Sequence, residues 1–281
     1  LLSVFVIGTK RLGAQRWIDL GPISIQPSEF AKIFLVLTLS SYMAKRSHER
    51  FEGFKAMTFS FLHMLPIFGL IALQPDLGTS LVLLIVYATL VFINGLDWRT
   101  IFILIVAAIL AVPGSYFFLL HDYQRQRVLT FLHPGEDMLG SGWNVMQSMI
   151  AIGSGGIDGK GFLQNSQSKL RFLPESHTDF IGAVYLEERG FLGGVALLFL
   201  YLFLLIQILK IADDTEEKFG KLICYGIASI FFFHIFINLG MIMGIMPVTG
   251  LPLLLMSYGG SSLVFAYMML GIVQSVKFHR G

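Results

Sequence analysis

Residues 191–211 read FLGGVALLFLYLFLLIQILKI, an apolar run that contains one charged side chain, Lys210. A helix that crosses the hydrocarbon core of a bilayer needs about 20 apolar residues. The run has that length, and it lacks the alternation of polar and apolar residues that marks a strand of a membrane β-barrel. It therefore predicts a membrane-spanning α-helix.

Apolar stretches of similar length recur along the chain, at residues 29–45, 57–74, 77–94, 100–120, 180–211, 219–244 and 250–276. Residues 1–8 have the character of the end of one more span, and they carry neither a Met nor the basic segment of a signal peptide. We expect an all-α, polytopic helical membrane protein with about seven complete spans and a stub. The chain is expected to be a fragment that lacks its N-terminal part.

The composition supports this class. Of the 281 residues, 55% are hydrophobic and only 14% are charged, whereas a soluble domain has about a quarter charged. The net charge of +2 gives no basic face for nucleic acid. Cys224 is the one cysteine, which excludes an internal disulfide and a cysteine-based metal centre. We expect a single integral membrane domain over residues 1–281.

The loops predict an orientation, because Lys and Arg gather in cytoplasmic loops. Alternating spans place several basic segments on one side, which we assign to the cytoplasm: residues 45–55, Arg99, residues 210–221 and residues 277–280. Segment 121–178 then becomes one large extracellular loop. Lys10, Arg11 and Arg16 also fall outside, against the rule, which suggests an anionic ligand there.

Asp179 is the first candidate for chemistry. It follows Pro174, which blocks a helix, and Thr178, a potential N-cap, so it lies near the outer end of a span. Gly182 and Ala183 share its helical face and would leave room for a substrate. The alternative is that an Asp in a first helical turn only complements the helix dipole. The sequence pattern by itself favours this alternative.

Three other acidic and basic residues lie at span ends or within spans. Glu29 and Lys32 are spaced as a self-neutralising ion pair, although an ionisable residue in a span is also a functional candidate. Asp76, between two spans, suits a plain helix cap slightly better than a site. It nevertheless faces the same compartment as Asp179.

The remaining candidates lie in the large loop and the last span. Arg125 and Arg127 suit a phosphate or pyrophosphate, or they anchor a span end at the headgroups. Glu175 and His177 stand beside Asp179, but their spacing matches no known metal site. Ser257 belongs to a small-residue stretch, 256–262, which either packs closely against another helix or breaks the span. Packing is the favoured interpretation.

These stretches together resemble the SEDS family (shape, elongation, division and sporulation proteins). The matching segments follow the family order over nearly the whole chain: GAQRWI (13–18), QPSEFAK (26–32), QPDLGT (74–79), YQRQR (123–127), GSGG (153–156), FLPESHTDF (172–180), MPVTG (246–250) and SYGGSS (257–262). The arginine and glycine segments are closer to the RodA branch than to FtsW or the sporulation paralogues. Gly182 departs from the family, in which Phe is common at this position.

The resemblance implies ten spans in the whole protein and a peptidoglycan glycosyltransferase that polymerises lipid II during cell-wall elongation and shape maintenance. Asp179 matches the family's essential aspartate and is the expected general base. Arg16, Lys32, Arg125 and Arg127 are expected to stabilise the leaving pyrophosphate, with a divalent cation, Mg²⁺ or Mn²⁺, and no organic cofactor. Glu29 and Asp76 match polar positions of the family's central cavity.

The resemblance also implies partners and a place in the cell. A class B penicillin-binding protein, which is a transpeptidase, and membrane proteins of the elongation complex are the expected partners. The location is the bacterial cytoplasmic (inner) membrane, with the active site facing outside. Two alternatives remain: a lipid II flippase or transporter, and a non-catalytic scaffold of the synthesis complex. A transporter would need ionisable residues near the bilayer midplane, and a scaffold should tolerate Asp179→Asn.

Overall fold

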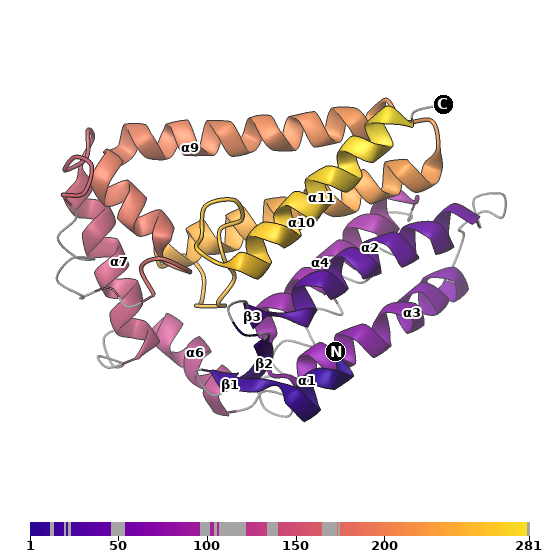
Figure 1. Cartoon of the computed structure of the whole chain (residues 1–281), viewed down its shortest axis with the longest axis horizontal. Helices are drawn as coiled ribbons and strands as arrows, with labels where there is room; N and C mark the ends of the chain where they lie inside the picture. The colour runs from indigo at the N-terminus through magenta and orange to yellow at the C-terminus, as the bar shows by residue number, and fades with distance from the viewer. Residues whose placement is uncertain are drawn as a thin grey trace. The chain divides into compact units, whose positions relative to one another are not determined.

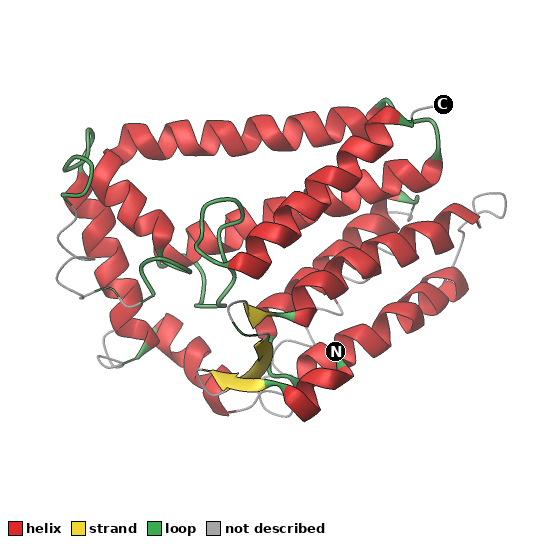
Figure 2. Cartoon of the chain, in the orientation of Figure 1, coloured by secondary structure: helices red, strands yellow, loops and turns green. Residues whose placement is uncertain are grey.

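The computed structural model describes residues 1–11, 14–19, 21, 24–45, 54–95, 102–103, 106, 122–133, 140–164, 173 and 175–279. These residues are mostly helical (Figures 1 and 2). The helices are α1 Leu2–Ile7, α2 Pro27–Lys45, α3 Phe54–Leu73, α4 Leu77–Ile93, α6 Asp122–Leu132, α7 Ser141–Gly155, α9 Ile181–Asp213, α10 Lys218–Ile242 and α11 Gly260–Phe278. The expected helical membrane class is confirmed. Most of the expected span 100–120 lies outside the described residues, as do residues 134–139 and 165–172 of the large loop.

A small antiparallel sheet follows α1 and was not predicted. Its strands, β1 Thr9–Arg11, β2 Ala14–Asp19 and β3 Ser24–Ile25, pair in the order β1-β2-β3. The strands are too short for an alternating pattern to stand out in the sequence. The sheet carries Arg16 on β2.

The chain forms two compact units. The first comprises residues 1–120, 207–230 and 264–281, and the second comprises residues 121–206 and 231–263. In the first unit α2, α3 and α4 lie side by side (Figure 1), with Leu35, Leu39, Leu83 and Leu90 fully buried. The second unit contains the candidate base.

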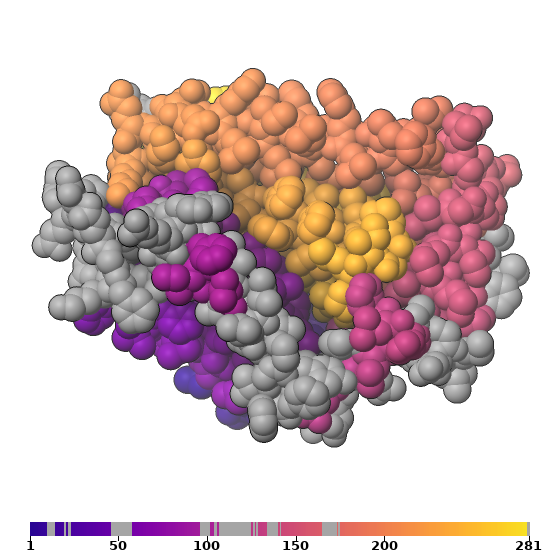
Figure 3. Space-filling model, turned by 180° about the vertical axis from the view of Figure 1, so that it is seen from behind, coloured from indigo at the N-terminus to yellow at the C-terminus, as the bar shows by residue number. Residues whose placement is uncertain are grey.

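The apolar helices are long enough to cross a membrane. Among the described residues, α9, α10 and α11 meet the length and hydropathy of a span, and α3 and α4 contain shorter apolar helices. Large side chains of α9 stay exposed, including Phe191 at 65% and Phe199 at 67%. Helix α9 belongs to the orange part of Figure 3. Such a surface is a lipid or protein contact, so the protein is an integral membrane protein.

The last span is shorter than predicted. Residues 250–276 were expected to be helical, yet α11 begins only at Gly260. Gly250 and Leu255 have positive φ angles of 75° and 69°, which a helix does not accommodate. The helix-breaking interpretation of the small-residue stretch, which the sequence did not favour, is therefore correct. Residues 250–259 form a loop, and this loop contacts the segment of Asp179.

Candidate functional site

Asp179 lies in a turn, residues 175–180, directly before α9. The helix begins at Ile181, two residues later than a cap at Thr178 would allow. Asn238, fully buried on α10, donates its side-chain Nδ2 to the carbonyl oxygen of Asp179 at 2.8 Å. The same nitrogen donates to Leu251 O at 2.8 Å. One amide group therefore ties the candidate base to the loop 250–259.

Ser257 fastens the same turn from the other side. Its Oγ donates to Thr178 O at 2.8 Å and accepts from Leu253 N at 2.8 Å. Beside it, Tyr258 N donates to His177 O at 2.8 Å. The Ser257 hydroxyl is thus used to hold backbone next to Asp179. This geometry indicates that Ser257 positions the backbone of the turn.

The carboxyl of Asp179 is partly exposed, and its pKa is raised to about 6. Burial is the largest cause, and the negative charge of Glu175 adds to it, while the positive charge of Arg127 lowers the pKa. The carboxylic acid of an Asp side chain in water ionises near pH 4. A pKa nearer the working pH makes the Asp179 carboxylate a stronger base, and the group is still largely deprotonated at pH 7.

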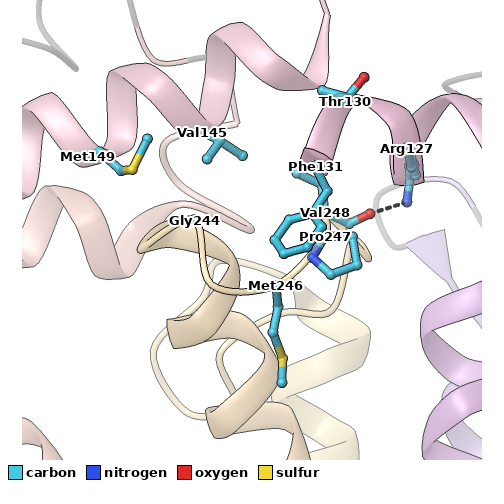
Figure 4. Close-up of a pocket in the computed structure, with 9 residues that line it drawn as sticks. All are labelled: Arg127, Thr130, Phe131, Val145, Met149, Gly244, Met246, Pro247 and Val248. Atoms are coloured by element: carbon cyan, nitrogen blue, oxygen red, sulfur yellow. Dashed lines mark hydrogen bonds between the residues drawn. The ribbon is translucent and has the colours of Figure 1, made fainter. Parts of the chain in front are cut away.

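Arg127 reaches across a pocket from α6. Its Nη1 donates to Val248 O at 2.9 Å, in the loop that leads to Gly250 (Figure 4). The pocket has a cavity volume of about 40 Å³, room for only a few waters at roughly 10–15 Å³ each. It is too small for a sugar. Arg127 therefore acts on the site through the Val248 loop and through its charge.

Arg125 and Arg127 both lie on α6 and are partly buried. Two positions apart on a helix, they lie about 160° apart around its axis. The two side chains therefore leave nearly opposite faces of α6.

Glu175 and His177 are both exposed. The Glu175 carboxylate accepts from Thr178 Oγ1 at 2.8 Å. Among the described residues no group of three or more His, Cys, Asp or Glu side chains could hold a metal ion.

A larger crevice in the second unit does not fit a charged substrate either. Its volume is about 730 Å³, and it is lined by α7, α9 and α10 without a charged side chain. A pyrophosphate requires cationic or hydrogen-bonding groups. The crevice is apolar in character, and Asp179 is not among the residues that line it.

The first unit holds a second polar group, centred on Asp76. Asp76 caps α4 by accepting from Thr79 N at 3.3 Å, and it also accepts from Gln26 Nε2 at 3.0 Å. Arg16 Nη1 lies 3.6 Å from its Oδ1 and Arg16 Nε donates to Gln74 O at 3.1 Å. The cap interpretation is confirmed. Arg16 braces the turn that carries the cap.

Glu29 and Lys32 form the ion pair that their spacing predicts. Lys32 Nζ lies 2.9 Å from Glu29 Oε2, with the Lys32 side chain fully buried and that of Glu29 3% exposed. The ammonium also lies 4.5 Å from the ring centroid of Phe265. A buried pair is costly to break, because the charge left behind is unpaired. Both residues are therefore fixed in place.

The structure thus divides the predicted site residues between its two units. In the second unit it gathers Asp179, Glu175, His177 and Ser257 on one turn and the adjoining loop, with Arg125 and Arg127 on α6. In the first unit it gathers Arg16 with Asp76 and Glu29 with Lys32.

Two features of the site differ from the sequence analysis. The sequence analysis did not single out Asn238, because the sequence shows it only as one Asn inside an apolar run. Gly182 and Ala183 do not leave space for a substrate. Ala183 is fully buried, and a Cβ at Gly182 would lie 2.9 Å from Ile242 Cδ1. These small residues allow α9 to pack closely against α10.

Apolar spans with a poised carboxylate at the end of one of them define a polytopic membrane protein with a potential acid–base centre. The family model described as "Cell cycle protein", covering FtsW, RodA and SpoVE, matches residues 1–281. The chain belongs to this family.

Individual relatives agree along the whole chain. Peptidoglycan glycosyltransferase MrdB of Escherichia coli K12 is 44% identical over 280 residues, covering 100% of this chain and 75% of MrdB. Peptidoglycan glycosyltransferase RodA of Treponema pallidum is 36% identical, covering 94% and 77%. The rod shape determining protein RodA of Thermus thermophilus superposes with a TM-score of 0.69 at 33% identity, covering 99% and 74%. A chain of a peptidoglycan synthase complex that coordinates polymerization and crosslinking reaches a TM-score of 0.84 at 37% identity, covering 99% and 77%.

Proposed function

We infer that this protein is a peptidoglycan glycosyltransferase that polymerises lipid II into glycan strands during cell-wall elongation and the maintenance of cell shape. Family membership over residues 1–281 and relatives that carry this activity support the inference. The observation that carries the mechanism is the Asp179 carboxyl. Asn238 holds the backbone of this residue, and Asp179 is partly exposed. The pKa of its carboxyl is raised to about 6.

Asp179 acts as general base. It takes the proton of the 4-hydroxyl of the acceptor sugar as that oxygen attacks C1 of the donor sugar. The bond between C1 and the lipid pyrophosphate breaks, the configuration at C1 inverts, and the pyrophosphate leaves with the electron pair. With a pKa of about 6, the carboxylate outnumbers the acid by about ten to one at pH 7.

The departing pyrophosphate needs positive charge to stabilise it. Arg127 is the cation whose charge already acts on Asp179, and Arg125 lies on the same helix. Arg16 and Lys32 are further candidates in the first unit, but each is engaged with a carboxylate. A phosphate would have to displace Asp76 or Glu29 from them.

The divalent cation, Mg²⁺ or Mn²⁺, enters this proposal only together with the substrate. Mg²⁺ is commonly held by one or two carboxylates and by substrate phosphates, without a complete protein cage. This is compatible with a described region in which no cluster of three ligating side chains occurs. No step of the mechanism above depends on the metal.

The proposal extends to partner and location. A class B penicillin-binding protein would crosslink the strands that this protein makes, since a chain of a synthase complex with coordinated polymerization and crosslinking has the same fold. The membrane is the bacterial cytoplasmic membrane, and the Asp179 side faces outside. The outer location rests on the distribution of Lys and Arg in the loops.

The experiment compares glycan polymer from the wild type and from Asp179→Asn. The full-length protein is purified with its penicillin-binding partner, the transpeptidase is blocked, and lipid II is supplied. Asp158→Asn is the control, because Asp158 is an exposed acid elsewhere in the second unit. If the wild type and the control make polymer and Asp179→Asn does not, the result supports Asp179 as the base. Equal polymer from Asp179→Asn moves the base elsewhere. No polymer from any folded complex favours a transporter or a scaffold.

A further inference from the structure

Helix α9 is broken at Gly190, where the backbone has φ 63° and ψ −164°. The break divides α9 into a short segment, residues 181–189, and a long apolar segment, residues 191–213, which run in different directions (Figure 1). Asp179 lies two residues before the short segment. The angle at Gly190 therefore sets where the carboxyl lies relative to the span.

The break is stabilised by the turn that follows α7, residues 156–164, called here the docking turn. Four backbone hydrogen bonds join it to α9: Phe191 N to Gly156 O at 2.9 Å, Leu192 N to Ile157 O at 3.1 Å, Lys160 N to Glu187 O at 3.0 Å and Gly161 N to Glu188 O at 3.0 Å. A broken helix leaves peptide groups without partners. The docking turn supplies them on both sides of the break.

The two backbones approach too closely for side chains. A Cβ at Gly190 would lie 2.3 Å from Gly159 N, and a Cβ at Gly159 would lie 2.2 Å from Glu188 O. Gly190 also requires its positive φ, which other residues adopt only with strain. The geometry of the break is therefore specified locally and is not a soft bend.

One ion pair fastens the docking turn to the short segment. Lys160 Nζ lies 2.6 Å from Glu187 Oε1, with the Glu187 side chain fully buried and the Lys160 side chain 28% exposed. A buried carboxylate without its cation is strongly unfavourable. Loss of Lys160 would therefore remove a contact that stabilises the charge of Glu187 and that holds the short segment against the docking turn.

We propose that Lys160 and Glu187 are positioning residues for Asp179: their ion pair fixes the short segment of α9 and, through it, the place of the catalytic carboxyl. The proposal rests on the function inferred above. The charges that act on the Asp179 pKa are those of Glu175 and Arg127, so Lys160 should affect the rate without moving the pH at which the base is protonated.

The test measures polymerisation kinetics of the full-length protein in complex with its partner. In Lys160→Gln, kcat should fall about 10- to 100-fold, because a displacement of about 1 Å has effects of that size. KM should stay near the wild-type value, and the acid limb of the pH–rate profile should not move. Lys160→Arg, which keeps the charge, should restore most of kcat. Asp158→Asn, an exposed charge in the same turn, is the matched control and should behave as wild type.

A second variant separates position from stability. Lys160→Gln/Glu187→Gln leaves no unpaired buried charge, so its melting temperature should return toward that of the wild type. A kcat that stays low in this stable double variant supports the proposal. A wild-type kcat in either Lys160→Gln or the double variant overturns it, as does an acid limb that moves with Lys160.

Hydrogen exchange distinguishes this proposal from the proposed function. The amides of residues 181–189 should lose protection in Lys160→Gln, while those of α10 keep it. A wild-type protein that makes no polymer would refute the glycosyltransferase, yet the exchange data would still show whether the pair holds the short segment. Unchanged protection of residues 181–189 would overturn the positioning role whatever the activity.

Discussion

Asn238 donates its side-chain amide to the carbonyl oxygen of Asp179 at 2.8 Å, from a fully buried position on α10. The bond holds the backbone of the candidate base and leaves its carboxyl to react. Because the same Nδ2 also bonds Leu251 O, the turn before α9 and the loop before α11 are fixed by one side chain. The base is therefore positioned by α10 and by the loop before α11.

Asn238→Asp should reduce polymerisation more than tenfold. The substitution keeps the shape but turns a donor toward two carbonyl oxygens into an acceptor, leaving both without their partner, at about 1–3 kcal/mol for each buried group. Lipid II polymerisation and the melting temperature of the purified complex provide the measurement. Asn144→Asp on α7, where the side chain is partly exposed, is the control. Wild-type activity in Asn238→Asp would contradict the role given to this bond.

The rate should fall as the pH drops through about 6, the pKa of Asp179. A general base works only in its deprotonated form, so activity is lost on the acid side and is present above that pH. Glu175→Gln removes a negative charge that raises the Asp179 pKa, and the acid limb should therefore move to lower pH. The measurement is kcat/KM against pH for both proteins. An acid limb that moves upward in Glu175→Gln would reverse the sign of this argument.

Arg127→Gln should move the acid limb to higher pH, because the positive charge of Arg127 lowers the Asp179 pKa. Arg127→Lys keeps the charge but loses the planar group that bonds Val248 O. It should leave the limb in place while lowering the rate. The two profiles, measured side by side, separate the charge of Arg127 from its contact with the loop. Identical profiles for Gln and Lys would show that the charge has no effect on the base.

The helical class was predictable because apolar runs of span length are a property of the sequence alone. Runs such as 77–94 and 180–211 agree with α4 and α9 to within a few residues. The predicted helix boundaries were wrong where tertiary contacts determine the end of a helix. The loop before Gly260 is held by Ser257 and Asn238, and composition does not reveal such contacts. The length of the apolar stretch therefore overestimates the length of the last helix.

The candidate site was predictable only in part, for a similar reason. Resemblance to a family singled out Asp179, while local pattern favoured a helix-dipole role for it. The residues that hold it come from distant segments: Asn238 lies on α10, and Lys160 acts through the docking turn. Asp76 shows the converse case, since a cap is a local feature and the sequence favoured it correctly.

Asp76→Ala should act on stability more than on catalysis. It removes the N-cap of α4 and leaves Arg16 and Gln26 without the carboxylate they contact. A lost cap costs about 1 kcal/mol, and the unpaired partners add to that. Asp76→Asn keeps an acceptor for Thr79 N and should recover most of the melting temperature. If KM for lipid II rises in Asp76→Asn while the melting temperature is restored, Asp76 contacts substrate, and the cap is then only part of its role. If both values return to wild type, the carboxylate serves to hold α4 and the turn that Arg16 braces.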